Sequence, residues 1–442
     1  MTAGPATRLG ILSDPNLGCF WLARTLSLIG DYAFRVAFVT YIISVSDSPT
    51  VLAVATAVLL LPPLVFYLVG GVTGDRVGSR RQVLVAADAA RFITLLLIAA
   101  GTFWTDSVPV LVGLAVLIGI ADGFFQPVSF AYLLEITPKD KLVTANSALS
   151  ISQQIGLVVG PLLGGFLVGF AGPSATFGFD ALTFLVSGVL LLLIRPQVQT
   201  APATAAEKPE RTFAGRGHLR QLLSEVADGV RYVTGVQWLL VSMMVGACAN
   251  AVYAGVLDVA IPLILSPKGI EGAESLGGYY ALQGIGAVIG AAILARLMIR
   301  RLGVTLYGML ATMAVALAMV GVIGGGPAAL AMAVVYGIGL HFCNTLFPAL
   351  IQERIPEALM SRVGSLAYLG FNGLMPLGAL VMGPLAAALN ARNAATLAGA
   401  LAACVALAAL LAPGVRRLRR DAPDEGADAA DDSRLETVSR TS

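Results

Sequence analysis

The sequence predicts an all-α membrane protein in which twelve transmembrane helices form two pseudo-symmetric six-helix bundles. Of its 442 residues, 57% are hydrophobic and only 12% are charged, and the mean hydropathy is +0.84. A single globular core could not bury so much apolar surface. The apolar residues gather in twelve runs, each long enough to cross the roughly 30 Å hydrocarbon core of a bilayer as a helix. The second half of the chain also repeats features of the first half.

Short polar or charged connections separate the twelve predicted spans. Their approximate limits are 17–45, 50–73, 81–103, 108–134, 143–171, 175–194, 237–265, 275–299, 303–325, 327–350, 361–389 and 393–413. Only the sixth and seventh spans are separated by a long connection. We therefore expect an N-terminal bundle over 17–194 and a C-terminal bundle over 237–413.

Three further segments flank or join the predicted bundles. Residues 1–16 are polar, and the run that follows is too long for a signal peptide, so we expect a cytoplasmic N-terminal segment. The connection 195–236 starts with a Pro/Ala/Thr-rich stretch and continues with an amphipathic pattern over 218–232, which predicts a cytoplasmic linker with an amphipathic helix. Residues 414–442 become rich in Asp, Glu, Ala and Ser, which predicts a disordered cytoplasmic tail.

The positions of Lys and Arg predict the orientation in the membrane, because cytoplasmic connections carry an excess of both. Apart from the long connection, one side of the predicted topology carries Arg8, Arg76, Arg80, Arg81, Lys139, Lys141, Arg300, Arg301, Arg354, Arg416, Arg417, Arg419 and Arg420. The other side carries only Lys268 and Arg392. With an Ala- and Gly-rich composition that favours a bacterial source, this predicts a multi-pass protein of the bacterial cytoplasmic (inner) membrane with both termini in the cytoplasm.

The two predicted bundles match each other at a spacing of 218 residues. At this spacing residues 135–138 (Glu-Ile-Thr-Pro) align with residues 353–356 (Glu-Arg-Ile-Pro). Four single residues also align: Ser147 with Ser365, Gly119 with Gly337, Gly160 with Gly378, and Gly165 with Gly383. We interpret the matches as an internal duplication, the alternative being coincidence in a glycine-rich chain.

Composition excludes several classes of function. The formal net charge is only +2, so nothing indicates a nucleic-acid partner. The four cysteines lie far apart and there are only two histidines, a pattern that fits no metal site or redox pair. The sequence has no clustered nucleophile and base, and no phosphate-binding loop of the form Gly-x-x-x-x-Gly-Lys-Ser/Thr. We therefore expect a protein that is not an enzyme, needs no cofactor or metal, and does not use ATP.

A glycine-rich, charged sequence joins the second and third spans. It reads Gly71-Val-Thr-Gly74-Asp75-Arg76-Val-Gly78-Ser-Arg80-Arg81. This resembles the loop signature of the major facilitator superfamily, Gly-x-x-x-Asp-Arg-x-Gly-Arg/Lys-Arg/Lys. We expect the glycines to permit close helix contact and a turn, and Asp75 with the arginines to form a charge latch that gates the cytoplasmic side. The alternative is an ordinary positively charged loop.

The fifth span carries a second motif of the same kind. It reads Gly156-Leu-Val-Val-Gly160-Pro161-Leu-Leu-Gly164-Gly165. This resembles the antiporter signature of the same superfamily, Gly-x-x-x-Gly-Pro-x-x-Gly-Gly, which is found chiefly in exporters. Glycines at a spacing of four share one helix face and allow another helix to approach, and Pro161 bends the axis. We expect an interface that rocks during transport, with a static packing seam as the alternative.

Further motifs resemble a narrower group, the twelve-span drug:proton antiporters that include macrolide efflux proteins and enterobactin exporters. They are Trp21-Leu22-Ala23-Arg24-Thr25 with Gly30-Asp31, Ala87-Asp88-x-x-Arg91, Phe125-x-Pro127, Ala145-Asn146-Ser147 and Asp180-Ala181-x-Thr183-Phe184. Many drug exporters carry an arginine early in the fourth span, but residues 110–121 here contain no charge. Whatever that arginine does for proton coupling must be done differently in this chain.

Charged side chains inside the spans are costly in a bilayer and are therefore candidates for function. Asp31 and Asp122 are the leading candidates for proton or cation sites. Asp122 has no basic residue in its own span, and a lone carboxyl at mid-membrane could exchange a proton. The alternative is a structural role, in which Asp31 pairs with Arg35 one helical turn away.

Other polar residues in the spans have weaker cases. Asp88 and Arg91, near the cytoplasmic end of the third span, could pair with each other, and Asp180 and Asp258 are expected toward the outer ends of their spans, within reach of water. His341 lies almost level with Asp122 in the repeat, although a histidine hydrogen-bonded between helices is the alternative. The candidates for cavity residues in the second half are Asn250, Tyr253, Tyr280, Gln283, His341, Asn344 and Asn372.

Together these features predict a secondary active transporter. The resemblance implies export of an amphiphilic or cationic, drug- or macrolide-like small molecule through alternating access, driven by protons that bind Asp31 or Asp122. The expected partners are the substrate, protons and the lipid bilayer, and we expect a monomer. The alternatives are an exporter of a siderophore or another metabolite and an importer on the same scaffold.

Overall fold

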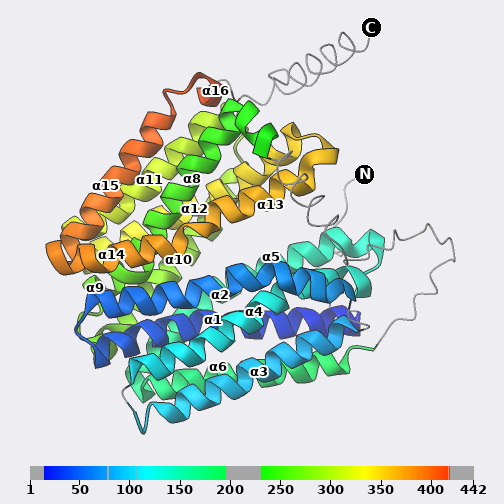
Figure 1. Cartoon of the computed structure of the whole chain (residues 1–442), viewed down its shortest axis with the longest axis vertical. Helices are drawn as coiled ribbons and strands as arrows, with labels where there is room; N and C mark the ends of the chain where they lie inside the picture. The colour runs from blue at the N-terminus through cyan, green and yellow to red at the C-terminus, as the bar shows by residue number, and fades with distance from the viewer. Residues whose placement is uncertain (1–13, 77–78, 106, 196–229, 417, 419–442) are drawn as a thin grey trace, which may run out of the picture.

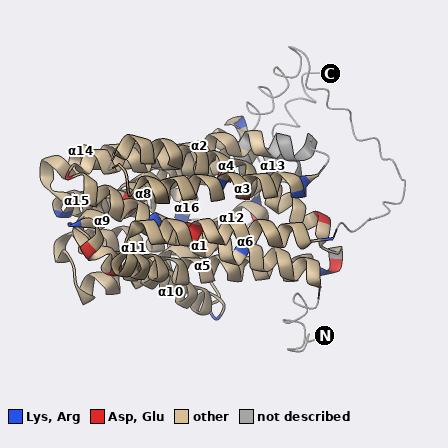
Figure 2. Ribbon diagram, turned by 90° about the horizontal axis from the view of Figure 1, so that it is seen from below, with Lys and Arg blue, Asp and Glu red and all other residues tan. Residues whose placement is uncertain are grey.

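The structure is a computed structural model that describes residues 14–76, 79–105, 107–195, 230–416 and 418. Within this part of the chain twelve helical spans are long and apolar enough to cross a membrane, which confirms the predicted number. Residues other than Lys, Arg, Asp and Glu dominate these helices (Figure 2). Most of the predicted linker helix and most of the predicted C-terminal tail lie outside the described residues, which include only 230–236 of the linker's second half and 414–416 and 418 of the tail, so both stay predictions.

Six helices form the N-terminal bundle (Figure 1): α1 (Pro15–Val45), α2 (Pro49–Arg76), α3 (Arg80–Gly101), α4 (Val108–Ile136), α5 (Leu142–Ala171) and α6 (Pro173–Leu193). Prolines lie in the first turn of α1, α4 and α6, because a first helical turn does not use the N–H that proline lacks. The Asp14 carboxylate caps α1 by accepting a hydrogen bond from the Asn16 N–H at 3.0 Å. Gly172, at φ +84°, forms the tight turn between α5 and α6.

The C-terminal bundle has more interruptions. Its elements are α8 (Gln237–Gly255), η3 (Val256–Ala260), α9 (Ile261–Leu265), η4 (Gly269–Gly272), α10 (Ala273–Leu294), α11 (Leu302–Ile323), α12 (Pro327–Arg354), α13 (Glu357–Gly373), α14 (Met375–Leu389), α15 (Ala391–Ala409) and α16 (Pro413–Arg416). α8 and α9 form one span, joined by the π-helical turn η3. The sequence predicts a single run over 361–389, but the structure divides it at Leu374 into α13 and α14. Pro376 explains the division, since proline removes an N–H and disfavours helix just before it.

Contacts between helix ends define two opposite ends of the molecule. Asn16, in the first turn of α1, donates from its side chain to the Arg195 carbonyl at 3.1 Å, which ties the start of α1 to the end of α6. At the opposite end, the hydroxyls of Thr102 and Ser174 hydrogen-bond the end of α3 to the start of α6. We call the end where α1 and α8 begin the termini end, and the other the far end.

The contacts of the repeated glycines support the duplication. A side chain at Gly160 would collide with the backbone of α1, and one at Gly378 with the backbone of α8, the corresponding helix of the other bundle. Likewise Gly165 packs against α10, whereas Gly383 packs against α2. Residues 218 positions apart therefore make equivalent contacts, within one bundle in the first case and between bundles in the second. Such close approach of small residues is how helices associate in lipid.

The hydrophobic cores show where the two bundles join. One core draws its residues from both bundles and lies toward the far end, with Phe34 and Ala53 on one side and Tyr279 and Ala379 on the other. A second core lies within the C-terminal bundle and a third within the N-terminal bundle, both toward the termini end. The bundles are thus packed together at the far end and separate at the termini end, as the ribbon also shows (Figure 1).

Candidate functional site: a charged cavity between the bundles

A cavity of about 430 Å³ lies where the two bundles separate. The N-terminal bundle supplies most of its wall through α1, α2, α4 and α5, and the C-terminal bundle closes it with α13 and α14. Both leading candidates, Asp31 and Asp122, line this cavity, together with Arg35. The structure therefore brings together three of the predicted site residues from α1 and α4.

Asp122 has a partner that the sequence does not reveal. The Arg91 guanidinium of α3 donates to the Asp122 carboxylate at 2.8 Å. The prediction of an unpaired carboxyl at this position is therefore wrong. α3 runs from the termini end and α4 returns to it, so Arg91, 11 residues into α3, comes level with Asp122, 14 residues from the end of α4. Arg91 thus lies halfway along its bundle. The expectation from the sequence that it lies near the cytoplasmic end of the third span is wrong.

Arg91 is the centre of a buried polar chain. Its side chain is fully buried and also lies 3.1 Å from the Asp88 carboxylate, which confirms that pairing. Ser187 of α6 donates to the other Asp88 oxygen at 2.7 Å. The guanidinium is enclosed by the rings of Phe125 and Phe184, at 4.3 and 4.4 Å from their centroids. Flat aromatic faces stabilise a buried cation in this way, so Arg91 is rigidly held.

Asp31 has no such partner. Among the residues that the structure describes, its carboxyl makes neither an ion pair nor a hydrogen bond, although Asp122, Arg91 and Arg24 lie close enough to interact electrostatically. Arg24 lies on α1, about two helical turns closer to the termini end than Asp31. It is buried, its guanidinium lies 5.0 Å from the centroid of the Phe125 ring, and it donates a hydrogen bond to Gln126 at 3.4 Å. Of the two carboxyls that line the cavity, Asp31 therefore lacks the direct positive partner that Asp122 has.

Asp180 adds a fourth carboxyl to this cluster. The sequence places it near the outer end of α6 within reach of water, but its exposure is only 2%. Thr183 donates to its carboxylate at 3.2 Å, and the glycine face of α1 at Gly30 packs directly on it. The expectation is wrong because α1 covers this face of α6. The cluster of four aspartates and two arginines carries an excess of acidic groups: Asp88 and Asp180 are buried with Arg24 and Arg91, whereas Asp31 and Asp122 border the cavity.

Arg35 makes an ion pair that links the two bundles. It does not pair with Asp31, its neighbour on α1, but with Asp258 in the π-helical turn η3 of the C-terminal bundle. The guanidinium also lies 5.5 Å from the centroid of the Tyr280 ring on α10. Asp258 is 3% exposed, so the prediction that water reaches it is wrong as well. The hydrophobic core shared by both bundles covers Asp258, because the bundles meet at this level.

The glycines of the antiporter motif face two different partners. Gly156, Gly160 and Gly164 lie against α1 of the same bundle, whereas Gly165 and the Pro161 carbonyl lie against Gly277 of α10. The motif therefore combines a packing seam inside one bundle with a contact between bundles. Its expected role in rocking stays a prediction.

The loop motif is only partly described. The α2 backbone continues through Arg76, but the side chains at 71–76 and residues 77–78 lie outside the described part of the structure, and with them Gly71, Gly74, Asp75 and Gly78. Arg80 pairs with Glu135 of α4 at 3.1 Å. Arg81 donates to the Ile194 carbonyl at 2.8 Å. Both arginines thus hold α3 to its own bundle, and the latch through Asp75 stays a prediction.

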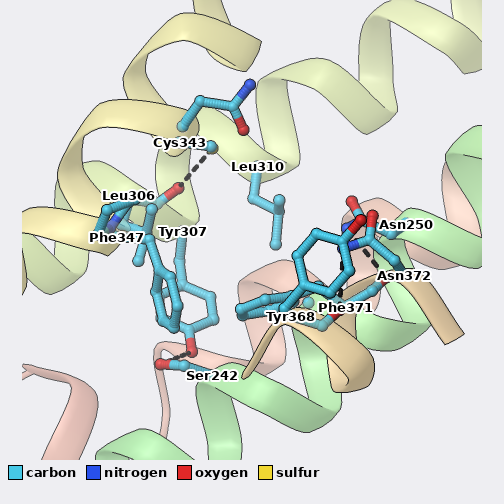
Figure 3. Close-up of a pocket in the computed structure, with 13 residues that line it drawn as sticks. Ser242, Asn250, Leu306, Tyr307, Leu310, Cys343, Phe347, Tyr368, Phe371 and Asn372 are labelled. Carbon is cyan, nitrogen blue, oxygen red and sulfur yellow. Dashed lines mark hydrogen bonds between the residues drawn. The ribbon is translucent and has the colours of Figure 1, made fainter. Parts of the chain in front are cut away.

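The candidates from the second half lie in different places. Asn250 and Asn344 line a second pocket, of about 360 Å³, inside the C-terminal bundle (Figure 3). His341 lines neither cavity; its ring lies 3.4 Å from the Thr345 hydroxyl, and its Cβ faces Gly290 of α10. Gln283 is buried where α10 meets α12 and lines neither cavity. Arg24 and Arg91 are the site residues that sequence reasoning undervalued, although the motifs that carry them were visible.

Comparisons with known proteins agree with this architecture. The multidrug efflux pump Tap of Mycobacterium tuberculosis is 29% identical over 413 residues, covering 90% of this chain and 93% of that protein. The enterobactin exporter EntS of Escherichia coli is 26% identical over 369 residues, covering 80% and 81%.

Solved structures show the same fold. The nucleoside transporter NupG superposes with a TM-score of 0.65 at 13% identity, covering 89% of this chain and 98% of that one. The xylose transporter XylE from E. coli, in an inward-open conformation, superposes with a TM-score of 0.63 at 17% identity, covering 88% and 94%. The model of the Major Facilitator Superfamily matches residues 20–379, and the chain is a member of that family of transporters.

Proposed function

We propose that the protein exports an amphiphilic or cationic small molecule across the cytoplasmic membrane in exchange for protons. The observation that carries the proposal is the pair of carboxyls, Asp31 and Asp122, on the wall of a cavity enclosed by both bundles. A carboxyl held inside the membrane can take up a proton when the cavity is empty and attract a cation when it has lost that proton. The similarity to a multidrug efflux pump supports export of drug-like compounds.

The proposed orientation places the termini end in the cytoplasm. The described connections at the termini end carry Arg80, Arg81, Arg300, Arg301, Arg354 and Arg416. Those at the far end carry only Lys268 and Arg392 among the same described residues. The excess of cations supports this orientation. In it the structure corresponds to a state whose cavity faces the cytoplasm, from which an exporter collects its substrate.

The proposed cycle uses the buried cluster as a proton store. Four aspartates face two arginines, and an uncompensated carboxylate is expensive away from water, so we expect part of the cluster to be protonated. A cationic substrate that approaches Asp31 supplies the missing positive charge and displaces a proton to the cytoplasm. When the bundles tilt and the far end opens, a proton from outside replaces the substrate. In this cycle Arg91 stabilises the charged form of Asp122 while the cluster has lost its proton, and Asp122 can be neutralised when the cluster takes up a proton again.

The test is proton release from energised inverted vesicles on addition of ethidium, a cationic dye. We expect wild-type vesicles to exchange dye for protons, and Asp31→Asn and Asp122→Asn to lose at least tenfold of that activity, because an amide neither releases a proton nor attracts a cation. Asp140→Asn is the matched control, since Asp140 lies exposed in the turn Lys139–Lys141 (η2). Normal exchange in both cavity variants would refute the role of these carboxyls.

Export of a siderophore or another metabolite is the second candidate. The similarity to an enterobactin exporter favours it, at 26% identity. The carboxyls on the cavity wall weigh against an anionic substrate. Export without proton exchange would refute the proposed antiport and leave export of a metabolite as the candidate. Movement of the dye into the lumen of right-side-out vesicles would instead favour import on the same scaffold.

A further inference from the structure

The pocket inside the C-terminal bundle differs in chemistry from the charged cavity. Four aromatic rings line it, those of Tyr307, Phe347, Tyr368 and Phe371 (Figure 3). Its polar groups are amides, hydroxyls and the Cys343 thiol, and no Lys, Arg, Asp, Glu or His side chain is among the described residues that line it. A neutral, ring-lined space is complementary to flat apolar groups.

The internal repeat shows why this space is open. Ser242, Cys343 and Asn344 of the pocket lie 218 positions after Arg24, Phe125 and Gln126. In the N-terminal bundle larger side chains occupy the equivalent region: Arg24 lies over the Phe125 ring and donates a hydrogen bond to Gln126.

The third helix of each bundle contributes to the same difference. α3 supplies the ion pair of Asp88 and Arg91, whereas α11 supplies Leu306, Tyr307 and Leu310 to the pocket. Packed protein interiors hold few spaces much larger than a water molecule. One half of the duplication has therefore been packed with charges, and the other has kept a pocket of about 360 Å³.

The pocket adjoins the charged cavity. Tyr368 and Asn372 of α13 line both spaces. Tyr368 also stacks on Tyr67 of α2 with ring centroids 5.0 Å apart, so the junction lies where the two bundles face each other. A single ligand could extend from the carboxyls of Asp31 and Asp122 across this junction into the aromatic pocket.

We propose that this aromatic pocket holds the uncharged ring system of the transported molecule while its cationic group faces Asp31 and Asp122. This inference rests on the proposed function and narrows its substrate class to cations that carry a planar aromatic system. Asn250 and Asn372 fix the pocket wall, because each donates to a backbone carbonyl of α13, at 3.1 and 2.9 Å. The C-terminal half thus selects by shape and the N-terminal half by charge.

Protection of Cys343 from a thiol reagent tests the occupant directly. In a variant that retains only Cys343 of the four cysteines, we expect saturating ethidium to slow labelling by a neutral maleimide at least fivefold. A matched variant that retains only Cys404, which is exposed on α15, should label at the same rate with and without the dye. Tetraethylammonium, a cation without rings, should protect neither.

A second variant tests the same space by filling it. Cys343→Phe places in the pocket the side chain that the N-terminal half has at the equivalent position, and we expect at least a tenfold loss of ethidium transport. Cys404→Phe is the matched control and should transport at the wild-type rate. Ethidium–proton exchange without protection of Cys343 would overturn the pocket but not the proposed function. Protection of Cys343 without ethidium–proton exchange would support binding of the ring system in the pocket and refute proton coupling. Absence of both protection and exchange would overturn binding in the pocket.

Discussion

At the scale of single residues, the N-terminal bundle is organised around charges that come from different helices. Arg91 of α3 lies between Asp88 and Asp122, and Asp180 of α6 is covered by α1. The contacts are short, and Asp88, Arg91 and Asp180 are removed from water, so small changes in position have large electrostatic consequences. The tightest packing in the cluster is at Gly30, where the backbone of α1 touches the Asp180 carboxylate.

Gly30→Ala should therefore destabilise the protein. The new methyl group would collide with the Asp180 carboxylate and the Thr183 hydroxyl, and overpacking of this kind costs about 1–3 kcal/mol. Gly18→Ala on the same helix is the control, because a methyl group there would meet nothing within 4 Å and alanine favours helix. Thermal unfolding of the purified protein in detergent would show a lower midpoint for the first variant only. Equal midpoints would contradict the close contact.

The partners of the candidate residues could not be read from the sequence. Local spacing predicts the Asp88–Arg91 pair, because both lie on one helix a turn apart. It fails for Asp122 and for Arg35, whose partners lie 31 and 223 residues away. Which carboxyl meets which guanidinium depends on how deep each helix brings its residue and which face it presents. The depth of a residue in the bundle and the face that its helix presents depend on tertiary packing, and neither can be read from a local sequence pattern.

At the scale of helices, glycine contacts decide which surfaces can slide. The α5 glycines at positions 156, 160 and 164 lie against α1 inside one bundle, while Gly165 faces Ala273 and Gly277 of α10 in the other. The equivalent Gly383 of α14 faces α2. The far end is thus closed by two equivalent seams at which a glycine of one bundle lies against a helix of the other. Smooth surfaces of this type interlock little, so two bundles can tilt along them.

Gly165→Ala should weaken the seam between α5 and α10. Its methyl group would meet the Ala273 carbonyl and push the bundles apart at the far end, which we expect to lower transport at least fivefold. Gly178→Ala in α6 is the control, since a methyl group there would meet nothing within 4 Å. In a background without native cysteines, a Thr40→Cys reporter beside η4 should react faster with an impermeant thiol reagent in the Gly165 variant. Unchanged reactivity would show that the seam does not hold the far end closed.

Most of the helical framework could be predicted because the bilayer fixes the length of each span. The twelve runs follow directly from composition, and the correspondence of Gly160 with Gly378 follows from the repeat spacing. The division of one span at Leu374 and the π-helical turn Val256–Ala260 did not follow. Both depend on a balance between local chain geometry and tertiary packing, and hydropathy alone is insensitive to that balance.

At the scale of the whole molecule, two similar bundles have acquired different tasks. The N-terminal half buries two arginines and two aspartates (Arg24, Arg91, Asp88 and Asp180), whereas the C-terminal half has a neutral aromatic pocket at the equivalent level. The structure holds one state, in which the far end is packed and the termini end is open. Asp258 is the carboxyl that the C-terminal half contributes across the boundary, and its pair with Arg35 exists only while the bundles meet at this level.

Exchange of charges between Arg35 and Asp258 tests whether this pair holds the far end closed. Arg35→Asp and Asp258→Arg each place two like charges at a contact in which the Asp258 side chain is buried and Arg35 borders the cavity, so we expect each to lower transport at least tenfold. The double variant restores opposite charges and should recover at least half of the loss, because contacting pairs typically couple by about 0.5–3 kcal/mol. The same exchange at Lys268 and Glu271, whose side chains are 76% and 73% exposed, should leave transport unchanged, since water screens an exposed pair. If the double variant is as inactive as the two single variants, Arg35 acts through the substrate in the cavity that it lines rather than through the gate.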